Sequence, residues 1–292
     1  MLKVGVSLPL EYVAGCEGAV SAGPWLAAFG EPRQGLATLR HWGVTHVELR
    51  DLNAGTPAAA LKAAWLALLR EGLLPTIHCA TPAQSCPRIE DAFPALAEGL
   101  AVHGPRAPVT LTMHALAGLE KSSSDYAEQT VEVLTSLAAG IASRGVPVRL
   151  ALENNRQGQR LDPSTTCEGM LAMLHGLAGP VVGVCWDFGH MWANIELWGA
   201  AATPPVAFVR RVIHAHVHAF DGATHRPLAS GMAPLKRWVA MLTGENYRGV
   251  YNLELSPNRT TRGLALDVKQ SIEVLCQTVA EAQRRISSDQ SV

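Results

Sequence analysis

Residues 148–188 read VRLALENNRQGQRLDPSTTCEGMLAMLHGLAGPVVGVCWDF, in which two short apolar strands flank a helical segment. The same alternation of strand and helix continues along the chain on both sides of this stretch. Alternating strands and helices predict a parallel sheet, and eight such units predict that the sheet closes on itself. We therefore expect an α/β fold in which residues 1–292 form one domain, a single (β/α)8 TIM barrel with parallel strands.

The expected strands are short apolar runs bounded by Gly or Pro, and the expected helices are rich in Ala and Leu. Strands are predicted at 3–8, 45–51, 74–79, 108–115, 148–154, 181–188, 212–221 and 249–255. Helices are predicted at 56–71, 123–144, 164–177 and 232–243, with a C-terminal helix at about 263–286. The connection at about 9–34 is unusually long, so we expect a rim loop there, either a lid over an active site or a plug without a catalytic part.

The composition indicates a folded protein with a large core. Hydrophobic residues make up 48% of the chain and charged residues 17%, which argues against disorder. The net charge is −1 and no block of Lys or Arg is present, so a nucleic-acid partner is not expected. The start MLKVGVSLPL reads as a strand, no apolar run is long enough to span a membrane, and the six cysteines form no CxxC pair. These features predict a cytoplasmic protein with reduced thiols.

The inward side of the expected strands carries groups that titrate or bind metals. Because side chains alternate along a strand, residues two apart share a face. The outward face is apolar, as at Val47, Leu49 and Trp186. The inward face carries, in chain order, His46, Glu48, His78, His114, Glu153, Asp187, His214, His216, His218 and Glu254.

A single strand histidine is more often a hydrogen-bonded core residue than a metal ligand. A ring of buried Glu, Asp and His is different, because without interleaved Lys or Arg its carboxylates repel one another. A divalent metal ion is the simplest compensation, and imidazole with carboxylate suits Mn, Co, Zn or Mg. The alternative is a metal-free hydrogen-bonded network. Among the lysines only Lys3 falls on an expected strand, which argues against Schiff-base chemistry.

Four motifs carry a resemblance to a known family. The segments LALENN (150–155), CWDFGH (185–190), HVHAFDG (216–222) and LELSP (253–257) resemble the xylose-isomerase-like superfamily of sugar phosphate isomerases and epimerases. The resemblance covers essentially the whole expected barrel, with the motifs in the same order.

The resemblance implies a site and a reaction. Glu153, Asp187, His218 and Glu254 would bind one divalent metal, and His190 and Arg226 would bind the substrate. Glu153 and Glu254 would also be catalytic, exchanging a proton through a metal-stabilised enediolate on a small sugar or keto-polyol, which would place the enzyme in carbohydrate metabolism. Asp221 would orient His218 or a loop. Since relatives are often dimers or tetramers, a homo-oligomer is compatible with this reading.

The same superfamily includes endonuclease IV, which gives a second hypothesis. His78, His114 and His225 resemble the additional metal ligands of that family and would hold a second metal for phosphodiester hydrolysis. However, Ala223 stands where the family keeps an aspartate, and the balanced charge is unusual for a DNA-binding enzyme. For His78 and His114 the alternatives are polar lining of the barrel or contact with substrate. A third hypothesis is a non-enzymatic binding barrel, which an intact ligand set disfavours.

Overall fold

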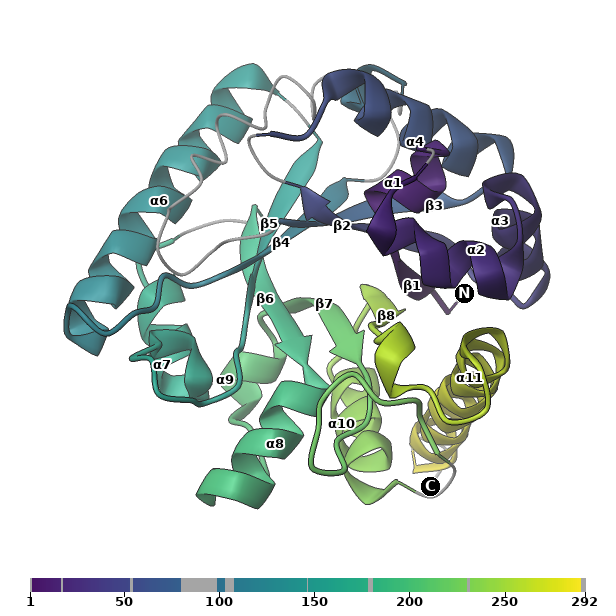
Figure 1. Ribbon diagram of the computed structural model, residues 1–292. Coiled ribbons are helices and arrows are strands. Elements are labelled where there is room, and N and C mark those ends of the chain that lie inside the picture. Colours follow the sequence, from purple (N-terminus) through teal and green to yellow (C-terminus); the bar gives the residue numbers. More distant parts are fainter. Residues whose placement is uncertain are drawn as a thin grey trace.

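The computed structural model describes residues 2–16, 18–52, 55–79, 99–102, 108–145, 147–177, 181–229 and 232–289. Within these ranges eight parallel strands close into a barrel in chain order, and helices surround it (Figure 1). The strands are β1 (Val4–Pro9), β2 (His46–Leu52), β3 (Leu74–Cys79), β4 (Val109–His114), β5 (Val148–Glu153), β6 (Val182–Asp187), β7 (Val212–Val217) and β8 (Val250–Leu253). The predicted parallel TIM barrel is confirmed.

Each predicted helix is present, with ends shifted by a few residues. The described helices are α1 (Leu10–Ala14), η1 (Val20–Ala22), α2 (Gly23–Phe29), α3 (Pro32–His41), α4 (Ala58–Arg70), α6 (Ser123–Arg144), η2 (Pro163–Thr165), α7 (Cys167–Leu174), α8 (Phe188–Trp198), α9 (Val206–Val209), α10 (Ala233–Gly244), η3 (Pro257–Arg259) and α11 (Leu264–Asp289). The stretch expected as a rim loop at 9–34 contains α1, η1, α2 and the start of α3. Burial of Trp25 stabilises this stretch: its side chain is 1% exposed and stacks on Phe29.

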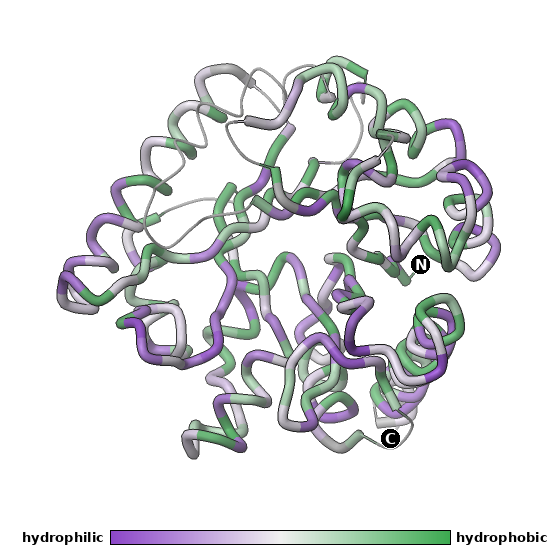
Figure 2. The backbone as a smooth tube through the Cα atoms, viewed as in Figure 1, coloured by the Kyte–Doolittle hydropathy of each residue, from purple (hydrophilic) through white to green (hydrophobic). Residues whose placement is uncertain are grey.

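The two faces of the strands differ as the alternation predicts. Trp186 points outward from β6 and packs against Phe188, Phe208 and Trp238 of the surrounding helices. Hydrophobic residues follow the strands and the inner sides of the helices, whereas hydrophilic residues gather on the outer turns and loops (Figure 2). The helices therefore bury their apolar sides on the outside of the barrel, which leaves the polar side chains of the strands in its interior.

Local signals define where the helices begin and end. Helix α6 starts with a capping box, because Ser122 Oγ accepts from the backbone N–H of Asp125 while the Asp125 carboxylate accepts from that of Ser122. It ends at Gly145, whose φ of 59° is the left-handed conformation that glycine adopts without strain. The last helix, α11, contacts α10 and α2, so it closes the ring of helices between β8 and β1.

The cysteines Cys16, Cys79, Cys167, Cys185 and Cys276 are unpaired, and Cys86 lies outside the described residues. No helix in the described part of the chain is long and apolar enough to cross a membrane.

Candidate metal centre

The four predicted ligands lie at the carboxyl ends of four adjacent strands. Glu153 and Asp187 are the last residues of β5 and β6, and His218 and Glu254 directly follow β7 and β8. All four are buried, with exposed fractions of 0%, 0%, 1% and 5%. This end of a TIM barrel is where active sites are found.

The imidazole nearest to both glutamates belongs to His216, on β7. Its Nδ1 lies 3.1 Å from Glu254 Oε2, 3.3 Å from Glu153 Oε1 and 3.8 Å from Asp187 Oδ2. His218 Nε2 lies 3.1 Å from Asp187 Oδ2. The structure thus brings the three predicted carboxylates together, with His216 rather than His218 between the two glutamates.

Further histidines surround the carboxylates. His78 Nε2 and His114 Nε2 lie 3.0 and 3.9 Å from Glu153 Oε2. His190, in the first turn of α8, places Nδ1 3.5 Å from both Glu153 Oε1 and Asp187 Oδ2.

His225, in the loop after β7, places Nδ1 3.9 Å from Glu254 Oε1. Together with His190 and His218 it forms a group whose nitrogen atoms lie within 4.8 Å of one another. The residues predicted for a second metal therefore border the first group on two sides.

The charge at this site requires a nearby cation. Burial alone would raise the pKa values of Glu153 and Glu254, but the surrounding histidines, first His114 for Glu153 and His225 for Glu254, hold both pKa values well below the ordinary range. Burial alone would lower the pKa of His216, but Cys185, Glu48, Glu153 and Glu254 raise it well above the ordinary range. No Lys or Arg in the described ranges lies within ion-pair distance of Glu153, Asp187 or Glu254. In the absence of metal, protonated histidine compensates these carboxylates.

The residues present fit a divalent metal ion. Glu153 Oε1, Glu254 Oε2 and His216 Nδ1 are buried and lack a hydrogen-bond partner among the described residues, although they converge. Atoms of His78, Glu153, His216 and Glu254 lie within 4.8 Å of one another, as do atoms of Glu153, Asp187 and His190. Buried polar atoms without partners are costly unless a bound ion satisfies them, and carboxylate with imidazole is a donor set for Mn, Co, Zn or Mg.

Neighbouring residues fix the position of Asp187. Asn154 Oδ1 accepts from the backbone N–H of Asp187 at 2.7 Å, and Asn154 Nδ2 donates to the carbonyl oxygen of Asp187 at 3.0 Å. Asp187 Oδ1 accepts from the backbone N–H of His190 at 2.6 Å and so caps α8. Oδ1 of this carboxylate therefore caps the first turn of α8, and Oδ2 faces His190 and His218.

Arg226 does not join this group. Its Nε lies 2.9 Å from Asp221 Oδ1, and it lines a cavity of about 400 Å³ with Trp192, Met232 and Gln270. Asp221, which we expected to orient His218 or a loop, pairs with Arg226 of the same loop, and its side chain is 65% exposed.

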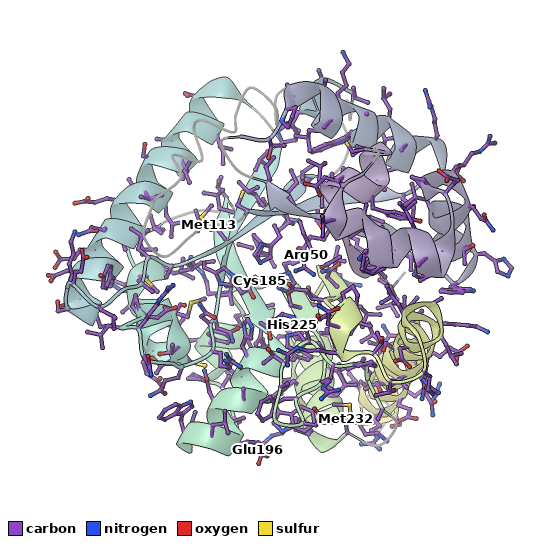
Figure 3. All side chains as sticks on the ribbon, in the orientation of Figure 1. Arg50, Met113, Cys185, Glu196, His225 and Met232 are labelled. Atoms are coloured by element: carbon purple, nitrogen blue, oxygen red, sulfur yellow. The ribbon has the colours of Figure 1, made fainter. Side chains whose placement is uncertain are left out.

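Sequence reasoning missed Arg50. It lies two residues beyond Glu48 on β2, so it shares the inward face and reaches the mouth of the barrel (Figure 3). Its charge contributes to the lowered pKa of Glu254, after the effects of burial, His225 and His216. Within the described ranges Arg50 forms no ion pair. The signal that could have found it is the alternation His46, Glu48, Arg50.

Comparison with known proteins supports the fold. A family model described as xylose isomerase-like TIM barrel matches residues 105–278. Among solved structures, a D-tagatose 3-epimerase-like protein is 17% identical with a TM-score of 0.68, covering 98% of this chain and 100% of that chain. A xylose isomerase domain protein from Alicyclobacillus acidocaldarius is 17% identical with a TM-score of 0.65, covering 97% and 100%. A D-psicose 3-epimerase is 14% identical with a TM-score of 0.60, covering 100% and 99%. No curated protein matches the chain.

Proposed function

Because the chain belongs to the xylose isomerase-like TIM barrel family, we propose that it is a metal-dependent isomerase or epimerase of a small sugar or keto-polyol. The observation that carries this proposal is the convergence of two buried carboxylates, Glu153 and Glu254, on one point at the barrel mouth. Sugar epimerases among the structural neighbours support the substrate class. Glu153, Asp187 and Glu254, with a histidine of β7 or its end, would hold the metal.

The two glutamates have the protonation state that proton abstraction needs. Because both pKa values lie well below the ordinary range, both side chains are carboxylates at neutral pH and can accept a proton. One glutamate takes the proton from the carbon beside the substrate carbonyl, and the electron pair of that C–H bond moves to the carbonyl oxygen. The bound metal would polarise this carbonyl and offset the charge of the enediolate.

The return of the proton decides the product. In an isomerisation the same glutamate returns the proton to the neighbouring carbon. In an epimerisation the facing glutamate, a carboxylate at neutral pH, first takes up a proton from solvent and then delivers it to the opposite face of the same carbon. His190, 3.5 Å from both Glu153 and Asp187, is placed to hold a substrate oxygen beside the carboxylates.

Exchange of hydrogen with solvent tests this proposal for any product, because both reactions pass through the same loss of a proton. The purified protein, loaded with Mn²⁺, is incubated in D₂O with a panel of ketopentoses, ketohexoses and keto-polyols, and NMR follows deuterium incorporation. We expect exchange at a carbon beside the carbonyl, lost in Glu153→Gln and Glu254→Gln and retained in Glu273→Gln, a matched control on α11 whose side chain is 65% exposed. If no ketose or keto-polyol exchanges with the metal-loaded protein, the proposal fails.

A second candidate function is metal-dependent phosphodiester hydrolysis. It is favoured by the contact of His78 with Glu153 and by the nearness of the His78 and His114 rings, whose centroids are 5.2 Å apart. Metal content separates the two candidates, because hydrolysis of this kind uses two or more ions. One metal per chain that survives His114→Ala supports the isomerase. Two or more metals, reduced by His114→Ala and accompanied by cleavage of an abasic-site duplex, would support the hydrolase.

A further inference from the structure

A further cavity, the amino-end cavity, lies at the end of the barrel opposite to the candidate metal centre. It measures about 680 Å³ and is bordered by the start of β1, the connection between α10 and β8, and the last turns of α11. Its lining includes Lys3, Tyr247, Arg248, Tyr251, Val279 and Ile286. Lys3 directly precedes β1, whereas Glu254 directly follows β8 at the other end of the strands. The volume is in the usual range for sites that bind small molecules.

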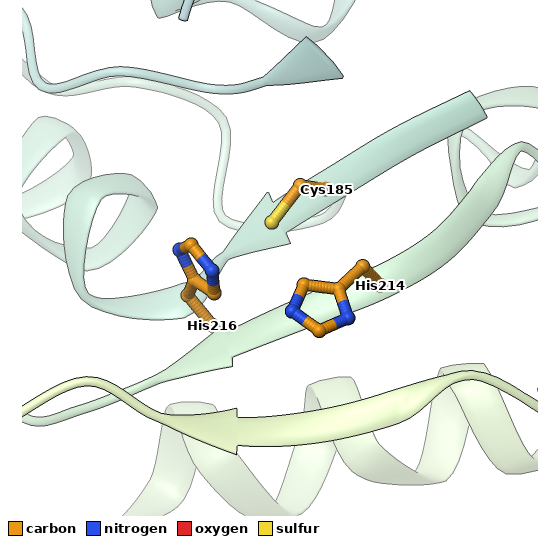
Figure 4. Close-up of side chains that lie close together, drawn as sticks. All are labelled: Cys185, His214 and His216. Carbon is orange, nitrogen blue, oxygen red and sulfur yellow. The ribbon is translucent and has the colours of Figure 1, made fainter. Parts of the chain in front are cut away.

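The filled interior of the barrel separates this cavity from the metal centre. Cys185 on β6 and His214 and His216 on β7 lie close together inside the barrel (Figure 4). All three side chains are 0% exposed, so the interior is closed at the level of these residues. A molecule in the amino-end cavity therefore does not touch Glu153 or Glu254, and the cavity is not a part of the candidate metal centre.

The side chains that line the amino-end cavity carry positive charge. Lys3 and Arg248 are its cations, and the lining, all of it within the described ranges, contains no Asp or Glu. The backbone N–H of Tyr251 donates to the carbonyl oxygen of Lys3 at 3.0 Å, so Lys3 lies beside the start of β8, which follows Arg248. Glu245, in the same connection as Arg248, pairs with Arg210 at 2.8 Å instead. Neither Lys3 nor Arg248 has an ion-pair partner among the described residues, and a cavity lined by one sign of charge attracts ions of the opposite sign.

The connection that carries Arg248 has a fixed conformation. Asn246 adopts the left-handed conformation with φ of 56°, and its backbone N–H donates to the carbonyl oxygen of Thr243 at 3.1 Å. A Cβ at Gly249 would overlap the carbonyl oxygen of Ile213 on β7, so the chain packs directly against the barrel there. The wall of the cavity is therefore formed before any ligand binds, as is usual for small-molecule sites.

Aromatic and apolar side chains also line the amino-end cavity. The rings of Tyr247 and Tyr251 meet edge to face, with centroids 4.9 Å apart. The Tyr247 hydroxyl donates to the carbonyl oxygen of Val250 at 2.7 Å, which leaves its ring rather than its hydroxyl to contact a ligand. Val279 and Ile286 of α11 add apolar surface. These side chains suit an apolar or aromatic body attached to the anionic group.

We propose that the amino-end cavity binds a phosphate monoester that carries an aromatic or apolar body. Such an ester has a charge of about −1.5 to −2 at pH 7, which the two cations match, whereas a carboxylate offsets only one of them. The guanidinium group of Arg248 suits the oxygens of a phosphate, and Lys3 supplies a second positive charge. Inorganic phosphate alone would leave the aromatic wall without a contact. This site goes beyond the proposed function and does not depend on it, because no residue of the candidate metal centre takes part.

Isothermal titration calorimetry of the full chain with four probes tests the ligand class. The probes are phenyl phosphate, inorganic phosphate, benzoate and benzyl alcohol, which together separate the charge from the aromatic body. We expect phenyl phosphate to bind more tightly than the other three. Its Kd should also rise with salt concentration, because the cations that attract it are partly exposed.

Paired substitutions locate the bound phenyl phosphate. Lys3→Gln with Arg248→Gln removes both cations of the cavity. Lys121→Gln with Arg156→Gln, the matched control, removes the same charge at two exposed positions outside it. We expect the Kd to rise about tenfold or more in the first double variant and to change little in the second. Glu254→Gln should bind phenyl phosphate as the wild type does, since the metal centre takes no part.

Three outcomes would overturn this inference. Equal Kd values in the two double variants would show that the cavity is not the site, and a Kd that rises only in Glu254→Gln would place the phosphate at the metal centre. Benzoate or benzyl alcohol binding as tightly as phenyl phosphate would contradict the ligand class. A wild type that does not bind phenyl phosphate at millimolar concentration would contradict the whole proposal. Arg248→Gln alone, at an exposed position, gives the same comparison if the double variant does not fold.

Discussion

Arg50, on the inward face of β2, carries a positive charge that acts on Glu254. Its charge favours the ionised form of Glu254, the form that accepts a proton. Removing the charge in Arg50→Met is therefore expected to raise the pKa of Glu254. The acid limb of the profile of kcat/KM against pH should then move to higher pH, whereas this effect should leave kcat/KM at neutral pH little changed, because Glu254 stays ionised there. Arg156→Met, at an exposed position after β5, is the control. An unchanged acid limb in Arg50→Met would show that Arg50 does not act on Glu254.

His46 predicts a pH dependence of stability away from the metal centre. Burial, and then the charges of Lys3 and His214, lower its pKa from 6.5 to about 3. Between these pH values the unfolded chain binds a proton that the folded protein excludes, so this residue makes stability fall as the pH drops. The slope is at most about 1.4 kcal/mol per pH unit. In urea unfolding of the metal-free protein at pH 7 and pH 5, His46→Gln should lose less free energy of unfolding than the wild type. A wild type and a variant with equal pH dependence would contradict this account.

At the residue scale the sequence predicts which side chains face the barrel interior better than it predicts which of them lie close together. Alternation along a strand correctly places Glu48, His214 and His216 inside the barrel. Alternation does not predict whether His214 or His216 lies beside the carboxylates of the metal centre. That depends on the tilt and register of β7 against β6 and β8. In the structure Asp187 pairs in register with His216, and His216 with Asn252, which raises His216 to the level of the site.

At the scale of elements, the junction of β6 and α8 brings backbone unusually close to a site residue. Asp187 ends the strand and caps the helix, and Gly189 follows in the first turn. A Cβ at Gly189 would overlap the His218 ring at Cε1, Nδ1 and Nε2. Gly189→Ala should therefore displace His218 from Asp187 and lower Mn²⁺ affinity about tenfold or more, as loss of a residue supporting a metal ligand does. Gly158→Ala, where a Cβ meets nothing within 4 Å, should bind Mn²⁺ as the wild type does. Equal Kd values for both variants would show that the close approach at Gly189 does not matter to the site.

Two element boundaries differ from the prediction because contacts between distant residues set them. The strand predicted at 212–221 ends at Val217, because the chain then turns back and Ala219 pairs antiparallel with Arg226. That turn contains His225 in the left-handed conformation, with φ of 60°. This pairing, together with the ion pair to Asp221, holds Arg226 beside the carboxylate of Asp221 rather than beside those of the metal centre. The helices within 9–34 were missed because they are short and are held by burial of Trp25 and Phe29 rather than by periodicity.

At the scale of the whole molecule, the barrel was predictable because every level of the sequence agrees with it. The strands have apolar outward faces and polar inward faces, and helices intervene between them. All three features specify the same closed sheet, in which neighbouring strands are parallel. The exception is the interior of the carboxyl end, where Glu153, Asp187 and Glu254 are buried beside one another. A core of carboxylates opposes folding unless positive charge offsets it, so the metal-free barrel depends on protonated histidines at this end.

This conflict predicts that metal binding stabilises the entire barrel. An ion that binds only the folded state adds RT ln(1 + [L]/Kd), about 4 kcal/mol at a thousandfold excess over Kd, which corresponds to a rise in Tm on the order of 10 °C. Calorimetry of the chelator-treated protein with and without added Mn²⁺ measures this difference. Glu254→Gln removes one buried charge and one ligand, so its metal-free form should unfold at a temperature close to or above that of the metal-free wild type, with a much smaller rise on adding Mn²⁺. If the Tm of the wild type does not change with Mn²⁺, protonated histidines alone must hold the carboxylates together, and the barrel would not need a metal to compensate them.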